Sequence, residues 1–217
     1  MQDLLPKSTS PYILHQKVLA VGKRQGLAKV TYVDPRDPTR KERQRDFIFL
    51  QGCPRPRPVG TLMPNVYRDE EAGTWCTILV QQFRANYEAD TVEFPAGFIE
   101  SRAGETAEQA AVREMEEETT RTGAVLARSP DLTSEPVPIA ARLVGVLLRA
   151  ADKTGAEAGR QRLDGGEFAV ECKVPLLGLE ERLKQFQEEE GVVVDPRVWT
   201  FAMGIKCALM LELHKAA

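Results

Sequence analysis

The chain has 217 residues, of which 42% are hydrophobic and 28% are charged, and its net charge at pH 7 is −3. Such a composition is typical of a folded protein of one or two domains. The near balance of charge excludes a strongly basic nucleic-acid-binding protein. No apolar run reaches the roughly 18 residues of a membrane span, and residues 1–10 lack the pattern of a secretory signal. We expect neither nucleic-acid nor membrane partners.

Four cysteines are spread along the chain: Cys53, Cys76, Cys172 and Cys207. Their separation matches no zinc or redox spacing, so we interpret them as reduced thiols in a cytoplasmic protein. His15 and His214 lie near opposite ends of the chain without a partner motif. Catalysis by histidine is therefore not expected.

The first third of the sequence predicts short β-strands over residues 12–20, 27–33 and 47–50. Between the last two lies a densely charged stretch, 34–45, which we interpret as a solvated hairpin loop. Proline recurs through residues 53–58 and excludes a central strand there. This segment is the expected boundary between two regions of the chain.

Beyond that boundary, strands and helices alternate. Apolar, β-branched runs predict strands over 62–67, 77–83, 91–94, 123–128, 138–148 and 168–174. Helical spacing of apolar residues predicts helices over 104–119, through 179–186 and after Asp195-Pro196. The glycine-rich segment 151–166 has no period and predicts a long loop. Strands interleaved with helices indicate an α/β or α+β domain with a mixed sheet.

The predicted helix over 104–119 is not an ordinary amphipathic helix. Its apolar side consists of Ala107, Ala110, Ala111 and Met115. Glu114 and Glu118 fall within that side and Glu117 at its edge, because residues three and four apart share a helix face. Burying such carboxylates costs several kcal/mol each unless a cation compensates. Mg²⁺ prefers oxygen ligands of this kind.

A solvated acidic surface is the alternative interpretation of this helix, because charge runs usually face water. Two features argue against it. The carboxylates share the apolar stripe instead of opposing it. The helix also follows residues 93–97, Glu-Phe-Pro-Ala-Gly, a strand end that turns into a glycine loop and would bring backbone carbonyls near the same face.

With these residues in view, the segment resembles the motif of Nudix hydrolases. That motif is a glycine, five residues, Glu, seven residues, and Arg-Glu-apolar-x-Glu-Glu-x-Gly-apolar. Glu105, seven intervening residues and the run Arg-Glu-Met-Glu-Glu-Glu at 113–118 match it in order and spacing. The sequence departs in three places. The loop between Gly97 and Glu105 is two residues longer, and Thr120 and Arg121 replace the glycine and the last apolar residue.

Other segments are similar to the ADP-ribose (ADP-sugar) pyrophosphatase branch of that family: 31–35, 82–84, 93–97, 165–168 and 194–198. The resemblance implies an α/β/α Nudix sandwich over 57–217. It also implies an antiparallel N-terminal β-region over 1–56 that serves dimerisation and substrate binding. A homodimer is expected, with Mg²⁺-dependent cleavage of ADP-ribose to AMP and ribose 5-phosphate and Mn²⁺ as an alternative metal.

The resemblance also assigns the metal site. Glu114, Glu117 and Glu118 are expected to ligate the metal, together with the backbone carbonyl of Ala96. Arg113 is expected to orient the carboxylates. Its i+4 neighbour is Glu117, so an ion pair along the helix is geometrically reasonable.

Further residues are expected to act on the substrate. By resemblance, Glu167 is a candidate general base, and Arg84 and Glu93 are candidate substrate contacts. For Glu167, a plain loop carboxylate is the alternative interpretation, and for Arg84 a surface arginine at a strand end.

Adenine recognition is expected to differ from that of close relatives, which stack the base between aromatic residues. The corresponding positions lie near Arg24 and Glu42, and neither is aromatic. A guanidinium plane can stack on a base, so Arg24, Arg43 or Arg45 is expected to substitute. Two other functions stay open: hydrolysis of another nucleoside diphosphate derivative, and a Nudix-fold binding protein without catalysis. Three repelling carboxylates argue against the second.

Overall fold

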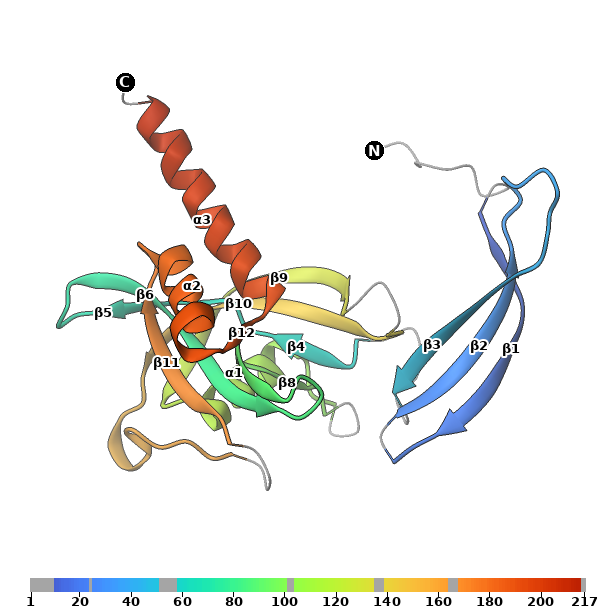
Figure 1. Cartoon of the computed structure of the whole chain (residues 1–217). Helices are drawn as coiled ribbons and strands as arrows, with labels where there is room; N and C mark the ends of the chain where they lie inside the picture. The colour runs from blue at the N-terminus through green and yellow to red at the C-terminus, as the bar shows by residue number, and fades with distance from the viewer. Residues whose placement is uncertain are drawn as a thin grey trace. The chain divides into compact units, whose positions relative to one another are not determined.

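A computed structural model describes residues 10–23, 25–50, 58–100, 104–134, 139–163 and 168–215 (Figure 1). The chain divides into two compact units. The first consists of Met1–Val59 with Leu132–Leu143, and the second of Gly60–Asp131 with Val144–Ala217.

The first unit contains an antiparallel sheet of β1 (Tyr12–Val21), β2 (Gln25–Val33) and β3 (Arg43–Leu50), with β2 in the centre. Strand β3 begins earlier than predicted, so Arg43 and Arg45 lie in a strand and not in the charged loop. The reason is backbone pairing with β2, in which Arg43 lies opposite Tyr32 and Arg45 opposite Val30. The first residues of β3 are exposed, so charged side chains there remain in water.

The second sheet has nine strands in the part of the chain that the structure describes. They are β4 (Gly60–Leu62), β5 (Asn65–Asp69), β6 (Thr74–Arg84), β7 (Ala89–Glu93), β8 (Ala96–Phe98), β9 (Arg121–Thr133), β10 (Arg142–Asp152), β11 (Val170–Pro175) and β12 (Val193–Val194). Strand β10 is parallel to β5 and β12 is parallel to β7, whereas β6 is antiparallel to β5, β7 and β11, so the sheet is mixed. The strand predicted over 62–67 is divided in two at Met63 and Pro64, because proline has no N–H for a sheet ladder.

Helices cover both faces of this sheet. They are α1 (Ala107–Glu118), α2 (Leu179–Glu190) and α3 (Pro196–Lys215), with a 3₁₀ turn, η3 (Gly155–Glu157), before β11. Neighbouring residues of a strand face opposite sides. Ile78 of β6 packs in one core with Met115 of α1, and Leu79 packs in a second core with Leu183 of α2. The predicted α/β fold with a mixed sheet is confirmed, with α1 on one face and α2 and α3 on the other.

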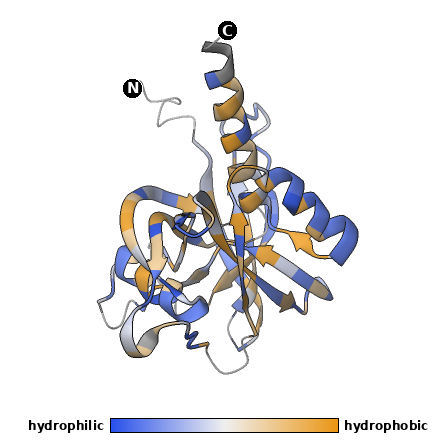
Figure 2. Cartoon of the chain, turned by 90° about the vertical axis from the view of Figure 1, so that its left-hand side faces the viewer, coloured by the Kyte–Doolittle hydropathy of each residue, from blue (hydrophilic) through white to orange (hydrophobic). Residues whose placement is uncertain are grey.

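The last helix is only partly buried. It starts after Asp195, whose carboxylate accepts a hydrogen bond from the Arg197 N–H at 2.7 Å. Val198 and Ala202 are buried as predicted, but Leu209 is exposed, so the apolar side of α3 continues beyond the core. Figure 2 shows hydrophobic residues along much of this helix.

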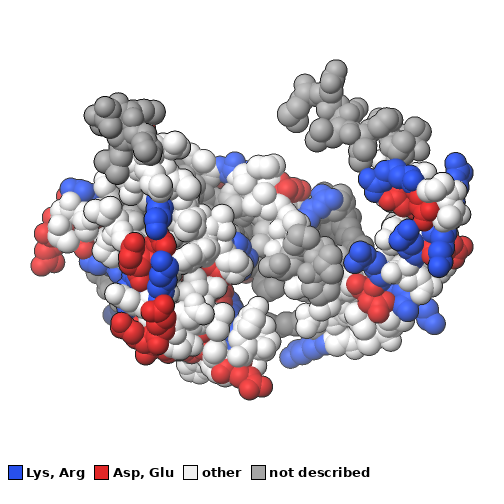
Figure 3. All heavy atoms as spheres, turned by 45° about the horizontal axis from the view of Figure 1, so that its top comes forward, with Lys and Arg blue, Asp and Glu red and all other residues white. Residues whose placement is uncertain are grey.

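Charges of both signs are intermixed on the face of the molecule drawn in Figure 3. This agrees with the small net charge of −3. None of the helices in the described ranges combines the length and apolar character that a bilayer crossing requires.

Candidate metal and catalytic site

The helix that carries the acidic run starts at a well-formed cap. The Thr106 hydroxyl accepts a hydrogen bond from the Gln109 N–H at 3.2 Å, and the Gln109 side chain accepts one from the Thr106 N–H at 2.9 Å. This capping box satisfies two N–H groups that the helix leaves free. Met115 and the alanines of the apolar stripe are buried. The cap and the buried apolar stripe together determine the orientation of α1, and therefore the direction in which its carboxylates point.

Strand β8 lies directly against two of these carboxylates. The Ala96 N–H donates to Glu118 Oε2 at 3.0 Å, and Glu118 is only 6% exposed. A Cβ added at Gly97 would lie 1.9 Å from Cδ of Glu114. With Glu114 in this position, only a residue without a side chain fits beneath it. Residues 96–97 of β8 therefore lie close to the acidic face, and the Ala96 group that contacts Glu118 is the N–H and not the carbonyl predicted as a metal ligand.

Arg113 binds several acidic and carbonyl oxygens at once. Its Nε and Nη2 donate to the Glu105 carboxylate at 2.8 and 3.0 Å, and its Nη1 donates to Glu114 at 2.8 Å and Glu117 at 2.9 Å. A further bond runs from Nη2 to the Phe98 carbonyl at 2.9 Å. All five N–H groups of the guanidinium are therefore used. The predicted pair with Glu117 is one part of this network.

The network changes the acid–base properties of its members. The hydrogen bonds to Glu105, above all, raise the pKa of Arg113, and the guanidinium lowers the pKa of Glu105. Glu105 matched the motif in the sequence but had no assigned role. The structure shows that it holds Arg113 in place with a two-point contact.

The acidic side chains suit a hard divalent cation, because their donors are all carboxylate oxygens. Within the described ranges no three His, Cys, Asp or Glu side chains are already gathered around one point. Glu114 and Glu117 are turned towards Arg113, and Glu118 towards the Ala96 N–H. Glu114 and Glu117 share one guanidinium nitrogen, so their oxygens are already neighbours.

Two predicted substrate contacts form a pair with each other. Arg84 at the end of β6 donates from Nε and Nη2 to the two oxygens of Glu93 in β7, at 2.8 and 2.7 Å. The Thr91 hydroxyl also donates to Glu93. Glu93 lies three residues before Ala96, which connects this pair along the chain to the acidic helix. Arg84 is about half-buried and Glu93 is mostly buried.

Three predicted residues remain, namely Arg24, Arg45 and Glu167. Arg24 and Glu167 lie outside the described residues. Arg45 is an exposed residue of β3 in the first unit.

The two departures at the helix exit have partners in the structure. The N–H and hydroxyl of Thr120 both donate to Glu171 Oε2 at 2.7 Å, and Arg121 Nε donates to Glu171 Oε1 at 3.0 Å. The Arg121 guanidinium also lies over the Tyr67 ring, 4.5 Å from its centroid. A glycine and an apolar residue could make none of these side-chain contacts. The departures therefore attach the helix exit to β11.

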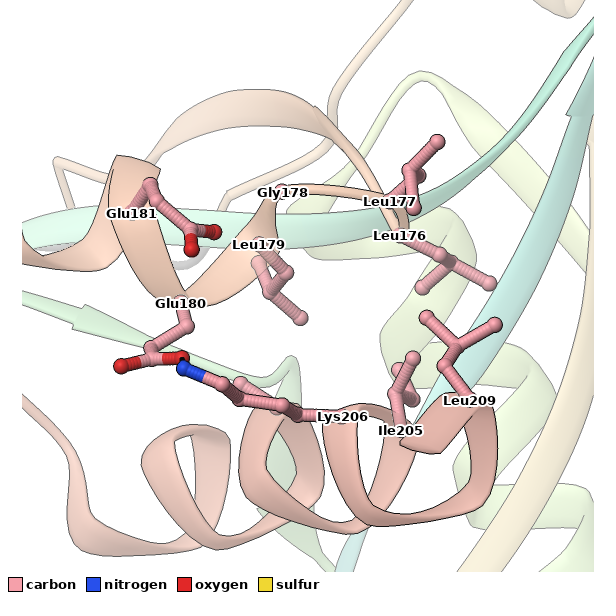
Figure 4. A pocket seen from close by; sticks show the side chains of 10 residues that line it. Leu176, Leu177, Gly178, Leu179, Glu180, Glu181, Ile205, Lys206 and Leu209 are labelled. Atoms are coloured by element: carbon pink, nitrogen blue, oxygen red, sulfur yellow. Dashed lines mark hydrogen bonds and ion pairs between the residues drawn. The ribbon is translucent and has the colours of Figure 1, made fainter. Parts of the chain in front are cut away.

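A cavity of about 130 Å³ lies between α2 and α3 and is lined mainly by leucine and isoleucine side chains (Figure 4). The ion pair of Glu180 and Lys206 lies beside it. It is smaller than the roughly 300–1,000 Å³ of typical ligand pockets. It also lies on the opposite face of the sheet from α1, so it is not part of the acidic site.

Comparison with known proteins agrees with this geometry. The NUDIX domain profile matches residues 56–190. An ADP-sugar pyrophosphatase of Mus musculus is 30% identical over 198 residues, which cover 90% of this chain and 88% of the mouse protein. An ADP-ribose pyrophosphatase of Saccharomyces cerevisiae is 30% identical over 199 residues, covering 89% and 82% of the two chains.

A solved structure described as an ADP compounds hydrolase has a similar fold, with a TM-score of 0.63. The similarity covers 94% of this chain and 96% of that one, at 17% sequence identity.

Proposed function

The chain belongs to the Nudix family, and from this premise we propose that it hydrolyses the diphosphate linkage of a nucleoside diphosphate sugar. We name ADP-ribose, cleaved to AMP and ribose 5-phosphate, as the substrate. Two relatives that match most of the chain are pyrophosphatases of ADP-sugar and ADP-ribose. The observation that carries the proposal is the network in which Arg113 binds Glu105, Glu114 and Glu117.

The proposed metal is Mg²⁺, which Mn²⁺ could replace. Glu114, Glu117 and Glu118 would hold it, with the carbonyl of Ala96. A bound cation of this kind neutralises diphosphate oxygens and acidifies a bound water. Arg113 holds Glu114 and Glu117 close together and offsets the repulsion between them.

Glu167 is proposed as the general base. It would take a proton from the attacking water as the new phosphorus–oxygen bond forms and the bond to the bridging oxygen breaks. Arg84, held by Glu93, would contact the substrate. Arg24 or Arg45 would stack on the adenine in place of aromatic residues.

The proposed assembly is a homodimer built through the first unit. Its strand β1 exposes large apolar side chains, including Tyr12, Ile13, Val18 and Val21. A second chain would cover them. We also propose a cytoplasmic location, because Cys76, Cys172 and Cys207 are free thiols, as is typical of a reducing compartment.

Phosphate-product release from a panel of diphosphates tests the function. The panel contains ADP-ribose, other ADP- and UDP-sugars, NADH, a dinucleoside polyphosphate and coenzyme A, each with Mg²⁺. We expect ADP-ribose to turn over fastest. Glu118→Gln should reduce turnover about 10–100-fold, while Glu116→Gln on the same helix should retain it.

A second substrate class is favoured by one observation, since the positions near Arg24 and Glu42 hold no aromatic residue. Faster turnover of another panel member would keep the chemistry and replace the substrate. Equal turnover by the wild type and Glu118→Gln would contradict the metal site. A folded wild-type protein that turns over no panel member would contradict the proposed hydrolysis.

A further inference from the structure

A distant segment holds the C-terminal end of α1. The last four carbonyls of a helix have no partner within the helix. One of them, Met115 O, accepts from the Thr119 N–H at 3.2 Å. The other three accept from the connection between β10 and β11: Glu116 O from Lys153 Nζ, Glu117 O from the Arg162 N–H at 2.8 Å, and Glu118 O from Gln161 Nε2.

Lys153 is central to this arrangement. Its ammonium group donates to the carbonyls of Glu116, Thr119 and Arg160, the second at 2.9 Å. The residue is only 9% exposed. A buried ammonium is favoured here, because the C-terminal end of a helix carries partial negative charge. Lys153 lies before the turn η3 and Arg160 lies after it. The hydrogen bonds of Lys153 therefore link the segments on both sides of η3 to the C-terminal end of α1.

The strand that follows this connection is also hydrogen-bonded to the helix exit. Glu171 in β11 accepts hydrogen bonds from Thr120 and Arg121, the residues just after the helix. The connection from β10 to β11 therefore contacts the helix end near its start and along its described course, and β11 itself contacts the residues just after the helix.

The residues held in this way include two expected metal ligands. Glu117 and Glu118 form the last turn of α1, and their own carbonyls accept from the connection. A metal site needs its ligands held to within about 0.5 Å, and the last turn of a helix frays when its carbonyls lack partners.

We infer that Lys153 is a positioning residue, which holds Glu117 and Glu118 in the orientation that metal binding requires by fastening the β10–β11 connection to the end of α1. The inference rests on the metal site proposed above.

Lys153→Met tests this role, because methionine keeps the length of the side chain and removes all three donors. Mn²⁺ binding, followed by electron paramagnetic resonance, should weaken about tenfold. With ADP-ribose and Mg²⁺, kcat should fall about tenfold while KM changes less. The matched control is Lys206→Met on the other face of the sheet. It removes the ion pair of Lys206 with Glu180. It should lower the melting temperature and leave the Mn²⁺ affinity unchanged.

Gln161→Met, which removes the hydrogen bonds of the side-chain amide to Glu118 O and Ala169 O, keeps the test decisive if Lys153→Met does not fold. It should weaken Mn²⁺ binding in the same direction. Unchanged Mn²⁺ affinity in the folded variants, with normal wild-type binding, would overturn the positioning role alone. A wild-type protein that binds no Mn²⁺ would overturn the metal site itself, and the inference with it.

Discussion

Gly97 of β8 lies directly against Glu114, an expected metal ligand. An added Cβ would lie 1.9 Å from Cδ and 2.1 Å from Oε1 of Glu114. These atoms are the end of a flexible side chain, so the fold can adapt by moving the carboxylate. Gly97→Ala should therefore remain folded, with Glu114 displaced.

The expected result for Gly97→Ala is weaker Mn²⁺ binding, by about tenfold, with little change in melting temperature. Electron paramagnetic resonance and a thermal melt measure the two quantities. Gly73→Ala makes a useful comparison, because a Cβ there meets nothing within 4 Å, although the positive φ of 64° adds strain. Loss of stability in Gly97→Ala with normal Mn²⁺ affinity would contradict the expected displacement of Glu114.

Glu180 gives the protein a pH-dependent contribution to stability. Hydrogen bonds from Lys184 and then Lys206 lower the pKa of this buried carboxyl in the folded state. Because the unfolded chain binds the proton more readily, this stability is present above the ordinary pKa of Glu and is lost as the pH falls through the folded pKa.

Lys206→Met should therefore lower the melting temperature at pH 7. The difference from wild type should shrink as the pH falls from the ordinary pKa of Glu through the lowered pKa of Glu180 in the folded protein, since below the latter Glu180 is protonated in both proteins. Melting curves between neutral and acid pH measure this, with the exposed Lys17→Met as control. A constant difference across the pH range would show that Lys206 stabilises by packing alone.

At the scale of single elements, hydrogen bonds from the side chain of Asn65 link β5 to β6. Its side-chain amide donates to Ile78 O at 2.8 Å and to Met63 O at 3.1 Å, and its oxygen accepts from the Ile78 N–H at 2.8 Å. The residue is fully buried. Asn65→Ala leaves these backbone groups without partners, which costs about 2–4 kcal/mol in the free energy of unfolding.

Urea unfolding checks the effect of Asn65→Ala. Asn86→Ala, in the exposed turn between β6 and β7, should change stability by no more than about 0.5 kcal/mol. Equal stability of both variants would mean that the Asn65 side chain is replaceable by water.

A secondary-structure element could be predicted when the residues that determine it lie close together in the sequence. The helix with its acidic stripe follows from residues close in sequence, and so does the pair of Arg113 and Glu117. The bonds from Arg113 to Glu105 and to the Phe98 carbonyl were not predicted. The break of one strand at Pro64 was missed, although proline was the available signal. The partners of Thr120 and Arg121 could not be predicted, because Glu171 lies about 50 residues further along.

For the molecule as a whole, the fold class was predictable because strands and helices alternate in the sequence. The placement of α1 opposite α2 and α3 was implied by the family resemblance and not by the alternation. The division into units follows a contact that no sequence pattern indicated. Ile48 of β3 pairs with Ile139, so residues near 132–143 join the first unit.

Metal binding should increase the stability of the whole protein. If Mg²⁺ binds the folded protein alone, a concentration 100 times the dissociation constant adds about 2.7 kcal/mol to the free energy of unfolding. A thermal melt with and without Mg²⁺ measures this, and Glu118→Gln is the control. An equal shift in that control would place the binding elsewhere on the protein.

The two ends of α1 also differ in when they can form. The first turn is capped by Thr106 and Gln109, which are three residues apart. The last turn depends on donors 37 to 45 residues downstream, from Lys153 bound to Glu116 O to Arg162 bound to Glu117 O. A growing chain therefore makes the start of the helix well before the residues that complete its end have been added. We expect the half that carries the acidic side chains to mature last, so a shortened chain would have a helix without a finished metal site.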